Sequence, residues 1–446
     1  MSTHLTDRLA DWAVTTTYED LPESVVHAAK RSIVDSLGCM AGGSGHGSVD
    51  ILLASLGDVF PDGPLGRHMI VGRSGALDIV NATLVNGVMA HVLDFDDTIL
   101  PTRCHISAPM LSSLLATAER VEASGKDVIT AFTVGFELVT RSADAVYDGK
   151  KGWHGTGVMG PLGVGAAVGR LLGLDQAATA QAFALGANQA SGIRASFGSM
   201  AKAWNLGRAG ANGLQAAILA SKGYTGGWNV LDAGAGFYEL FTDEPAYDIL
   251  TDDLGERWAI ERNGFKPHPC GFVAHAAIDA VVEARSKQSV DPTTIEEIRL
   301  TVCPETMVLT SKQQPATGLE GKFSVFHSAA AAYLDGVVTP ETYTDGVVAD
   351  ERYRALAAKV TATPDPDYGQ GEARVEIIAP DGTTSAYVAN ALGTDANPMS
   401  DAQLQEKYER MATPVFGSGT QALAETVWKL EQHDASDMLR HMSSTA

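Results

Sequence analysis

The sequence predicts a mostly α-helical protein, in which a large all-helical domain carries an inserted, smaller α+β domain. Helical periodicity runs through residues 1–265, strand-like alternation begins after Lys266, and helical periodicity returns near Pro398. A chain of 446 residues is also too long for one ordinary hydrophobic core. We therefore expect the helical domain at 1–265, the α+β domain at 266–394 and a return to the helical domain at 395–446.

The helical segments share apolar residues at helical spacing and a high content of alanine and glycine. Aromatic residues make up only 7% of the chain, so these helices are expected to pack closely through small side chains. Pro22 and Glu23 open one helix and Gly42 and Gly43 close it, as is usual at helix ends. The predicted helices of the first part are residues 5–14, 22–43, 78–93 with a continuation to about Thr98, 126–146, 175–189 and 208–221, and residues 109–119 form a further apolar run.

Strands are predicted only after residue 265. Residues 294–303, TIEEIRLTVC, alternate as a half-buried strand does. Residues 373–380 and 385–389 flank Asp381 and Gly382, a strong hairpin signal. The further helices are predicted at residues 274–286, 325–334, 401–411 and 419–432.

Composition excludes several classes of partner. A formal net charge of −22 disfavours nucleic acid and anionic membranes, which require basic surfaces. An anionic substrate would need locally concentrated lysine, arginine and histidine. The four cysteines show no metal-binding spacing, and the N-terminus lacks a signal-peptide pattern. A reduced, cytoplasmic protein without a membrane span is therefore predicted.

The most informative stretch is residues 91–109, HVLDFDDTILPTRCHISAP. Its carboxylates follow a long apolar helix that Pro101 is expected to end, where the helix dipole already places negative charge. A solvated helix end is the simpler interpretation, but the flanking apolar runs favour a buried functional site. On a helix that reaches Thr98, the side chains of His91, Asp94 and Thr98 would lie along one face. Asp97 would lie beside that face, and Asp96 would point elsewhere. His105 and Ser107 would follow on the next loop.

Other segments add cationic groups. Residues 155–169 lack a preceding strand, so their glycines indicate close helix contacts and not a dinucleotide site. A lone histidine is often structural, a lysine is usually solvated, and a proline-rich segment is sometimes only a linker. Set among apolar helices and at a domain junction, these groups instead suggest an anion site. They are His154 at a helix start, Lys202 and Arg208 in 197–208, Lys266 and His268 in KPHPCG with His275 beyond, and Lys322 and His327 in 321–328.

The inventory combines carboxylates, lysines and histidines without metal spacing or a cofactor motif. This set suits proton transfer on a small polycarboxylate, because cationic groups hold carboxylates while a histidine or aspartate moves the proton. No metal and no organic cofactor are predicted.

In these motifs the chain resembles the MmgE/PrpD family, which includes 2-methylcitrate dehydratases, cis-aconitate decarboxylases and iminodisuccinate epimerases. The resemblance covers almost the whole length and implies a large helical domain, a lid domain, a homodimer and catalysis without a cofactor. The motifs that carry it are HVLDFDDT with HISAP, GWHGTG, GSMAKAWNLGRAG, KPHPCG with HAAIDA, and GKFSVFHSAAAAYLDG.

The chain also departs from the family pattern. Gly271 stands where the decarboxylases have a histidine, Phe326 replaces a tyrosine, and the loop between Thr98 and His105 is one residue longer. These differences weaken the decarboxylase alternative. The loop also lacks the tryptophan-rich sequence of the 2-methylcitrate dehydratases, so the substrate does not follow from the resemblance.

The resemblance implies a cofactor-independent lyase acting on a di- or tricarboxylate. The alternatives are an epimerase of a dicarboxylate such as iminodisuccinate, and a non-catalytic carboxylate-binding protein. The family's active-site positions correspond to Asp94, Thr98, His105, His154, Lys202 and Lys266. We expect His105, oriented by Asp94, to move the proton, with Lys202 also catalytic, and the substrate to be bound by Thr98, His154, Lys266, His268 and Arg103.

Overall fold

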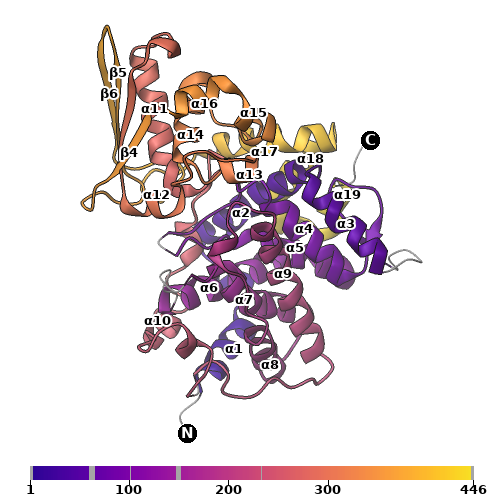
Figure 1. The fold of residues 1–446 in the computed structure, drawn as a ribbon. Coiled ribbons are helices and arrows are strands. Elements are labelled where there is room, and N and C mark those ends of the chain that lie inside the picture. Colours follow the sequence, from indigo (N-terminus) through magenta and orange to yellow (C-terminus); the bar gives the residue numbers. More distant parts are fainter. Residues whose placement is uncertain (1–3, 60–65, 101, 147–151, 233, 443–446) are drawn as a thin grey trace.

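The fold class predicted from the sequence is confirmed: most elements are helices, and one small mixed sheet lies in the second part of the chain (Figure 1). The computed structural model describes residues 4–59, 66–100, 102–146, 152–232 and 234–442. Its helices up to residue 251 are α1 (Leu5–Thr15), α2 (Glu23–Gly43), α3 (Gly47–Val59), α4 (Ile79–His91), α5 (Ser107–Val121), α6 (Gly125–Val146), α7 (Gly155–Leu171), α8 (Gln176–Ala187), α9 (Ala201–Ala220) and α10 (Tyr247–Thr251).

The second part of the chain alternates short helices and strands before the helices return. Its helices are α11 (His275–Lys287), α12 (Pro304–Leu309), α13 (Gly318–Gly321), α14 (Val325–Asp335), α15 (Asp345–Ala349), α16 (Glu351–Ala357), α17 (Asp401–Phe416), α18 (Gly419–Trp428) and α19 (Ala435–Arg440). The strands of the whole described chain are β1 (His68–Met69), β2 (Ala76–Leu77), β3 (Glu297–Val302), β4 (Val360–Pro364), β5 (Ala373–Ala379) and β6 (Gly382–Val388).

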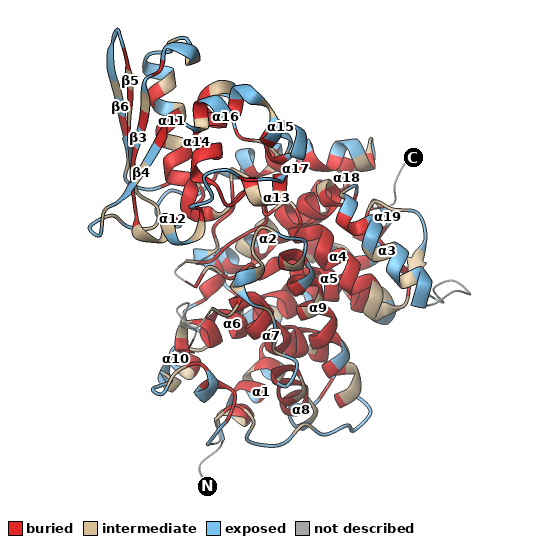
Figure 2. Cartoon of the chain, in the orientation of Figure 1, coloured by how far each residue is buried: buried red, intermediate tan, exposed pale blue. Residues whose placement is uncertain are grey.

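Helices α4, α5, α7 and α9 form the buried centre of the helical part (Figure 2). Small residues allow their close approach, as the glycine content of 155–169 predicted. A Cβ atom on Gly163 of α7 would lie only 2.4 Å from the carbonyl oxygen of Gly135 on α6. Glycine is therefore required at this crossing, where the two backbones touch. None of the helices in the described ranges is both long and apolar enough for a membrane crossing.

The four-stranded sheet has the order β4–β3–β5–β6. The predicted hairpin is confirmed: β5 and β6 pair antiparallel with Ala379 opposite Gly382, whose φ of 131° suits glycine in the turn. Helices α11 and α14 lie against one side of the sheet (Figure 1). Strand β4, parallel to β3, was not predicted, because it is short, mostly solvent-exposed and ends in Pro364.

Apolar residues form two large, separate cores. One core contains residues from α1 to Ile260 together with residues 408–442 of the return, so that α17 packs on α2. The other contains residues between Cys270 and Ala391. We refer to the parts around these cores as the helical part and the lid. The exact limits of 1–265, 266–394 and 395–446 stay a prediction.

Two helix limits differ from the sequence prediction in ways that matter for the site. Helix α4 ends at His91 and does not continue to Thr98, because Asp94 adopts a left-handed φ of 51° that no helix accommodates. Helix α9 starts at Ala201, seven residues earlier than predicted, because Gly207 fits against Leu84 of α4 and does not break the helix. Pro101 lies outside the described residues.

Candidate active site

The site is built around a turn that follows α4. The backbone N–H of Asp94 donates to the carbonyl oxygen of His91 at 2.8 Å, and the chain then runs on until Thr98 pairs with Gly264. The expected helical stripe of His91, Asp94 and Thr98 is therefore wrong. Asp96, expected to point elsewhere, is buried, and its Oδ1 lies 2.8 Å from Nδ1 of His91. A non-glycine residue held at positive φ is uncommon, and Asp94 is the residue that the site uses most.

Asp94 holds two buried lysines that come from different parts of the chain. Lys202, in the first turn of α9, donates to Asp94 Oδ2 at 2.7 Å, and Lys266, at the entrance to the lid, donates to Oδ1. Lys266 also donates to the Asp94 carbonyl oxygen at 3.2 Å. Burial alone would raise the pKa of the Asp94 carboxyl, but the two ammonium groups hold it well below its usual range. Two cations on one carboxylate leave an excess positive charge inside the protein.

The two lysines differ in their hold on the proton. Burial lowers the pKa of Lys202, whereas the charges of Asp94 and Asp96 outweigh burial and raise the pKa of Lys266. Lys202 also lies between two aromatic rings, with Nζ 5.1 Å from the centre of Phe197 and 5.2 Å from that of Phe323. Lys202 is thus the more acidic ammonium, and Lys266 is the more persistent positive charge.

His105 is fixed as a proton acceptor. Its Nδ1 donates to the Asp97 carbonyl oxygen at 2.7 Å, so the expected orientation by Asp94 is wrong. A carbonyl oxygen only accepts, which places the ring proton on Nδ1 and leaves the lone pair on Nε2. Burial lowers the pKa of His105 well below its usual value, and the charges of Lys266 and Lys202 lower it further. His105 is therefore a neutral imidazole that can take up a proton at Nε2.

His154, unlike His105, carries its ring proton on Nε2. It is the N-cap residue of α7, as predicted, and the side-chain amide of Asn205 donates to its Nδ1 at 3.2 Å. The ring proton of neutral His154 then lies on Nε2, which has no hydrogen-bond partner among the described residues although it is buried. Burial, with the charge of Lys202, holds the pKa of His154 well below its usual value. The His105 and His154 rings lie 6.4 Å apart, so an acceptor and a donor share one site.

These groups line a single cavity between the helical part and the lid. It contains seven of the eight predicted site residues, namely Asp94, Thr98, Arg103, His105, His154, Lys202 and Lys266. Sequence reasoning missed Arg194 and the aromatic residues Phe197, Phe272 and Phe323, because no spacing distinguishes them from core residues. The hydroxyl oxygen of Thr98 has no hydrogen-bond partner among the described residues and is available to a ligand.

The three other histidines named from the sequence, His268, His275 and His327, belong to the lid. His268 is not among the residues that line the cavity, and its Nε2 lies 2.8 Å from Asp279 of α11. His275 packs against His268 and Phe272. His327 bonds the Thr342 carbonyl oxygen at 3.0 Å. We interpret all three as structural.

A second group of side chains supports the turn from behind. Asp97 accepts hydrogen bonds from Ser107 at 2.6 Å and from Asn263 at 2.8 Å, and burial raises the pKa of Asp97 to about 7. Lys407, on α17 of the return, donates to the Phe95 carbonyl oxygen at 2.6 Å and to Asp35 at 2.5 Å. The turn is thus held by segments that are remote from it in sequence.

Lys322 joins the lid to the same turn. Its Nζ donates to the carbonyl oxygens of Leu93, in the helical part, and of Pro269, in the lid, at 2.6 and 2.9 Å. Burial lowers the pKa of Lys322 to about 8. The site therefore forms only where the two parts of the chain meet.

His91, Asp96 and His105 also bring three possible metal ligands within 4.8 Å of one another. The electrostatics of the surroundings oppose a cation there. Burial, and after it the charges of Lys202 and Lys266, lower the pKa of both histidines, so added positive charge is disfavoured at their rings. The arrangement favours an anion held by the lysines.

The chain matches two family models in sequence order. The MmgE/PrpD N-terminal domain matches residues 7–250, and the MmgE/PrpD C-terminal domain matches residues 268–432. The chain is 28% identical to a mouse cis-aconitate decarboxylase, over 95% of this chain and 90% of the relative. It is 26% identical to the cis-aconitate decarboxylase-like protein oryM of Aspergillus oryzae, over 99% and 97%. It is 25% identical to a 2-methylcitrate dehydratase of Escherichia coli K12, over 80% of this chain and 78% of that relative.

Proposed function

The chain belongs to the MmgE/PrpD family, and from this premise we propose that it is a cofactor-independent lyase that acts on a small di- or tricarboxylate. The observation that carries the proposal is the pair of buried ammonium groups on one carboxylate, facing a neutral histidine base. The relatives named as a cis-aconitate decarboxylase and a 2-methylcitrate dehydratase support this class of reaction and substrate.

The first part of the proposed mechanism is substrate binding. Lys266 and Lys202 neutralise a substrate carboxylate, and the Nε2–H of His154 and the Thr98 hydroxyl orient it by hydrogen bonds. Arg103, which lines the same cavity, adds positive charge to it. Because these donors are fixed in a buried site, they also stabilise the enolate-like charge that develops when a neighbouring C–H bond breaks.

The second part is proton transfer. In a dehydration, Nε2 of His105 takes the proton from carbon, the C–O bond breaks as the double bond forms, and Lys202 protonates the departing hydroxyl to give water. In a decarboxylation, the C–C bond breaks, carbon dioxide leaves, and the carbanion takes a proton from Lys202. In both reactions Lys202 is the acid, because its pKa is lowered while that of Lys266 is raised.

One observation favours an epimerase as the alternative. His105 and His154 line the same cavity with opposite proton states at Nε2, as a proton exchange on two faces of one carbon requires. Such an enzyme would leave all carbon–carbon and carbon–oxygen bonds intact.

Proton NMR in heavy water, with cis-aconitate, citrate, 2-methylcitrate and iminodisuccinate in separate tubes, distinguishes these functions. A new alkene signal, or hydration of an existing one, supports the lyase and identifies the leaving group. Deuterium entering a substrate C–H without net breakdown supports the epimerase. No change in any tube, combined with carboxylate binding by calorimetry, would support the non-catalytic binding protein and contradict the lyase.

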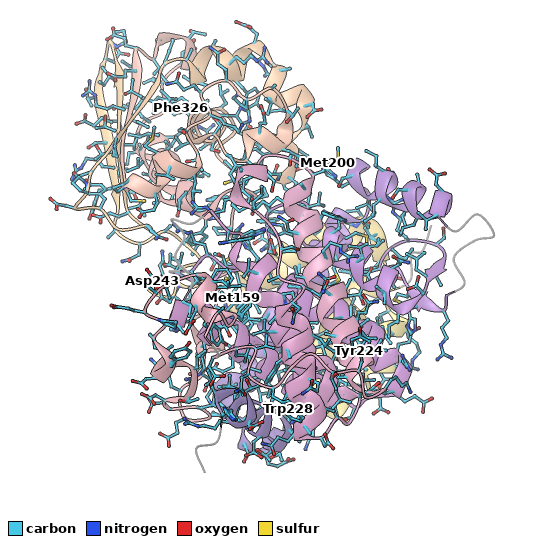
Figure 3. The ribbon with its side chains drawn as sticks, turned by 60° about the horizontal axis from the view of Figure 1, so that its bottom comes forward. Met159, Met200, Tyr224, Trp228, Asp243 and Phe326 are labelled. Carbon is cyan, nitrogen blue, oxygen red and sulfur yellow. The ribbon has the colours of Figure 1, made fainter. Side chains whose placement is uncertain are left out.

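We also propose a cytoplasmic homodimer, as the resemblance implies. Large apolar side chains are exposed on and after α9, among them Trp204 at 50% and Trp228 at 63%, and a second copy would cover them. Figure 3 shows Tyr224 and Trp228 on the helical part. Light scattering of the purified protein gives the mass, and a monomer would contradict this proposal.

A further inference from the structure

Lys202 and Asp94 separate two cavities. One is the substrate cavity described above. The other has a volume of about 20 Å³ and is lined on its far side by His91, Met200 and Lys322. Figure 3 shows Met200 where the helical part meets the lid. This volume is enough for about one water molecule.

His91 is the unexplained group in the second cavity. Its side chain is only 1% exposed, and its Nδ1 lies 2.8 Å from both carboxylate oxygens of Asp96. The other ring nitrogen, Nε2, has no hydrogen-bond partner among the described residues. A buried, unpartnered nitrogen costs free energy, and a water molecule in the adjoining cavity would satisfy it.

From this geometry we propose that His91 and Asp96 form a proton relay, which recharges Lys202 through a water molecule in the second cavity. The inference rests on the proposed function, in which Lys202 gives up a proton in each turnover. Asp94 and Lys266 cannot replace that proton readily: Asp94 is a carboxylate held ionised by two ammonium groups, and Lys266 retains its proton more firmly than Lys202. Lys322, whose pKa is lowered to about 8, also lines the second cavity, but its Nζ donates to the carbonyl oxygens of Leu93 and Pro269. His91 is the other titratable side chain of that lining, and its Nε2 has no partner among the described residues.

The proton balance of the step is closed, and in a dehydration the proton that His105 took from carbon leaves to solvent between turnovers. In the loaded pair, Asp96 carries a proton on its carboxyl and His91 carries one on Nε2. The Nε2–H bond breaks and its proton passes to the water, the water gives a proton to the neutral amine of Lys202, and the Asp96 proton moves to Nδ1 of His91. The pair is left as Nδ1–H and a carboxylate, and it regains one proton from solvent between turnovers.

The charges that face His91 support such sharing. Lys202, Lys266 and Lys322 contribute positive charge, Asp94 contributes negative charge, and His105 and His154 are neutral rings at 4.7 and 6.3 Å. Burial, with the Lys202 charge, lowers the pKa of His91 well below its usual value, while burial raises the pKa of Asp96 to about 7. The Asp96 carboxyl is therefore suited to hold and release the extra proton of the pair near neutral pH.

The first measurement needs no substrate. In protein labelled with ¹⁵N-histidine, the relay predicts that His91 changes from the Nε2–H tautomer to the Nδ1–H tautomer as the pH rises through about 7. Its signal is identified by its loss in His91→Gln. In Asp96→Asn, which cannot release a proton, the change should disappear. A single His91 tautomer between pH 6 and pH 8 in the wild-type protein would overturn the proposal.

The second measurement uses turnover. Lys202 begins protonated, so the first turnover of His91→Ala should stay within about 3-fold of wild type, while the steady-state rate falls by about 10-fold or more. Imidazole, which fits the space left by the ring, should restore the steady-state rate. His327→Ala removes an equally buried ring from the lid and should show neither the split nor the rescue.

The outcomes separate the two proposals. Equal losses in the first and later turnovers would mean that His91 only positions the turn, which overturns the relay but leaves the lyase intact. A wild-type protein that turns over no carboxylate contradicts the proposed lyase, and the tautomer measurement then decides alone whether the pair shares a proton as inferred.

Discussion

Two buried ion pairs in this molecule have opposite uses. Glu137 and Arg141 on α6 form one, and Asp94 with Lys202 and Lys266 forms the other. All five residues are at most 7% exposed. Removal of such charges from water is costly in both places, so burial alone does not identify a functional site.

The difference lies in how completely the polar atoms are paired. All five N–H groups of Arg141 are used: Nε donates to Glu137 at 2.6 Å, and the two Nη atoms donate to four backbone carbonyl oxygens between residues 249 and 257. The second oxygen of Glu137 accepts from the Ala259 N–H at 2.7 Å. Nothing is left over for a ligand, so this pair acts as a clamp on one loop.

The Asp94 cluster has an excess of one positive charge, and the polar atoms around it are incompletely paired. Nε2 of His154 and Oγ1 of Thr98 have no hydrogen-bond partner among the described residues. The comparison teaches that incomplete pairing beside a net charge distinguishes a binding site from a structural ion pair. It also predicts that the two kinds of variant differ. Variants of the Asp94 cluster should lose activity and keep stability, whereas variants of the Glu137–Arg141 pair should lose stability and keep activity.

The largest effect is expected for His105→Gln. Loss of the general base should lower kcat by about 10²- to 10⁴-fold, with the melting temperature nearly unchanged. Steady-state kinetics and thermal unfolding of the same preparation measure both. Wild-type turnover in this variant would remove His105 from the mechanism.

Arg141→Met tests the other half of the comparison. Breaking a buried pair leaves the Glu137 charge uncompensated, so the free energy of unfolding should fall by about 3–5 kcal/mol. The activity per folded molecule should be unchanged at low temperature. Chemical denaturation measures the loss, and a stable but inactive variant would show that the clamp belongs to the site.

Lys202→Met should lower kcat/KM by about 10²- to 10³-fold, because an ammonium that stabilises developing negative charge is lost. Asp94 keeps Lys266 as its partner and the excess charge disappears, so stability should be equal or higher.

Lys266→Met should raise KM more than it lowers kcat, since Lys266 binds without giving up its proton. Wild-type kinetics in either variant would exclude that lysine from the scheme.

The smallest effect concerns the supporting Asp97. Its pKa is about 7 in the folded protein, against about 4 when unfolded, so the folded state holds the extra proton between these values. Stability from this group is greatest below pH 4 and falls as the pH rises to 7. Between pH 6 and pH 7.5 the free energy of unfolding of Asp97→Asn should therefore fall by about 1 kcal/mol less than that of the wild type. An unchanged pH slope in denaturation experiments would contradict this shift.

Much of the fold followed from local pattern. Asp381 and Gly382 predicted the β5–β6 hairpin, and periodicity predicted α2, α6 and α14 to within a residue or so at most ends. Strand β4 was missed because VTATP has little apolar alternation and depends on its parallel partner β3. The overrun of α4 has a similar cause, because only the tertiary contacts of Asp94 reveal its left-handed backbone.

Most residues that line the cavity could be named from the sequence, but the contacts between them could not. Lysines in apolar surroundings indicated Lys202 and Lys266, but no local pattern indicates that both bind Asp94. The His91–Asp96 pair was missed because a continuous helix would have turned Asp96 away. His268 was expected at the substrate because of its position in a rigid loop, yet Asp279, eleven residues later, binds it.

The contact between Lys407 and Phe95 has a consequence for the order of events during synthesis. The two residues are 312 positions apart, so at about 5–20 residues per second the ribosome makes Lys407 roughly 15–60 s after Phe95. Throughout that interval the acidic turn has been translated but lacks the cation that holds its backbone. This turn is therefore among the last parts of the helical core to mature, long after the helices around it have been made.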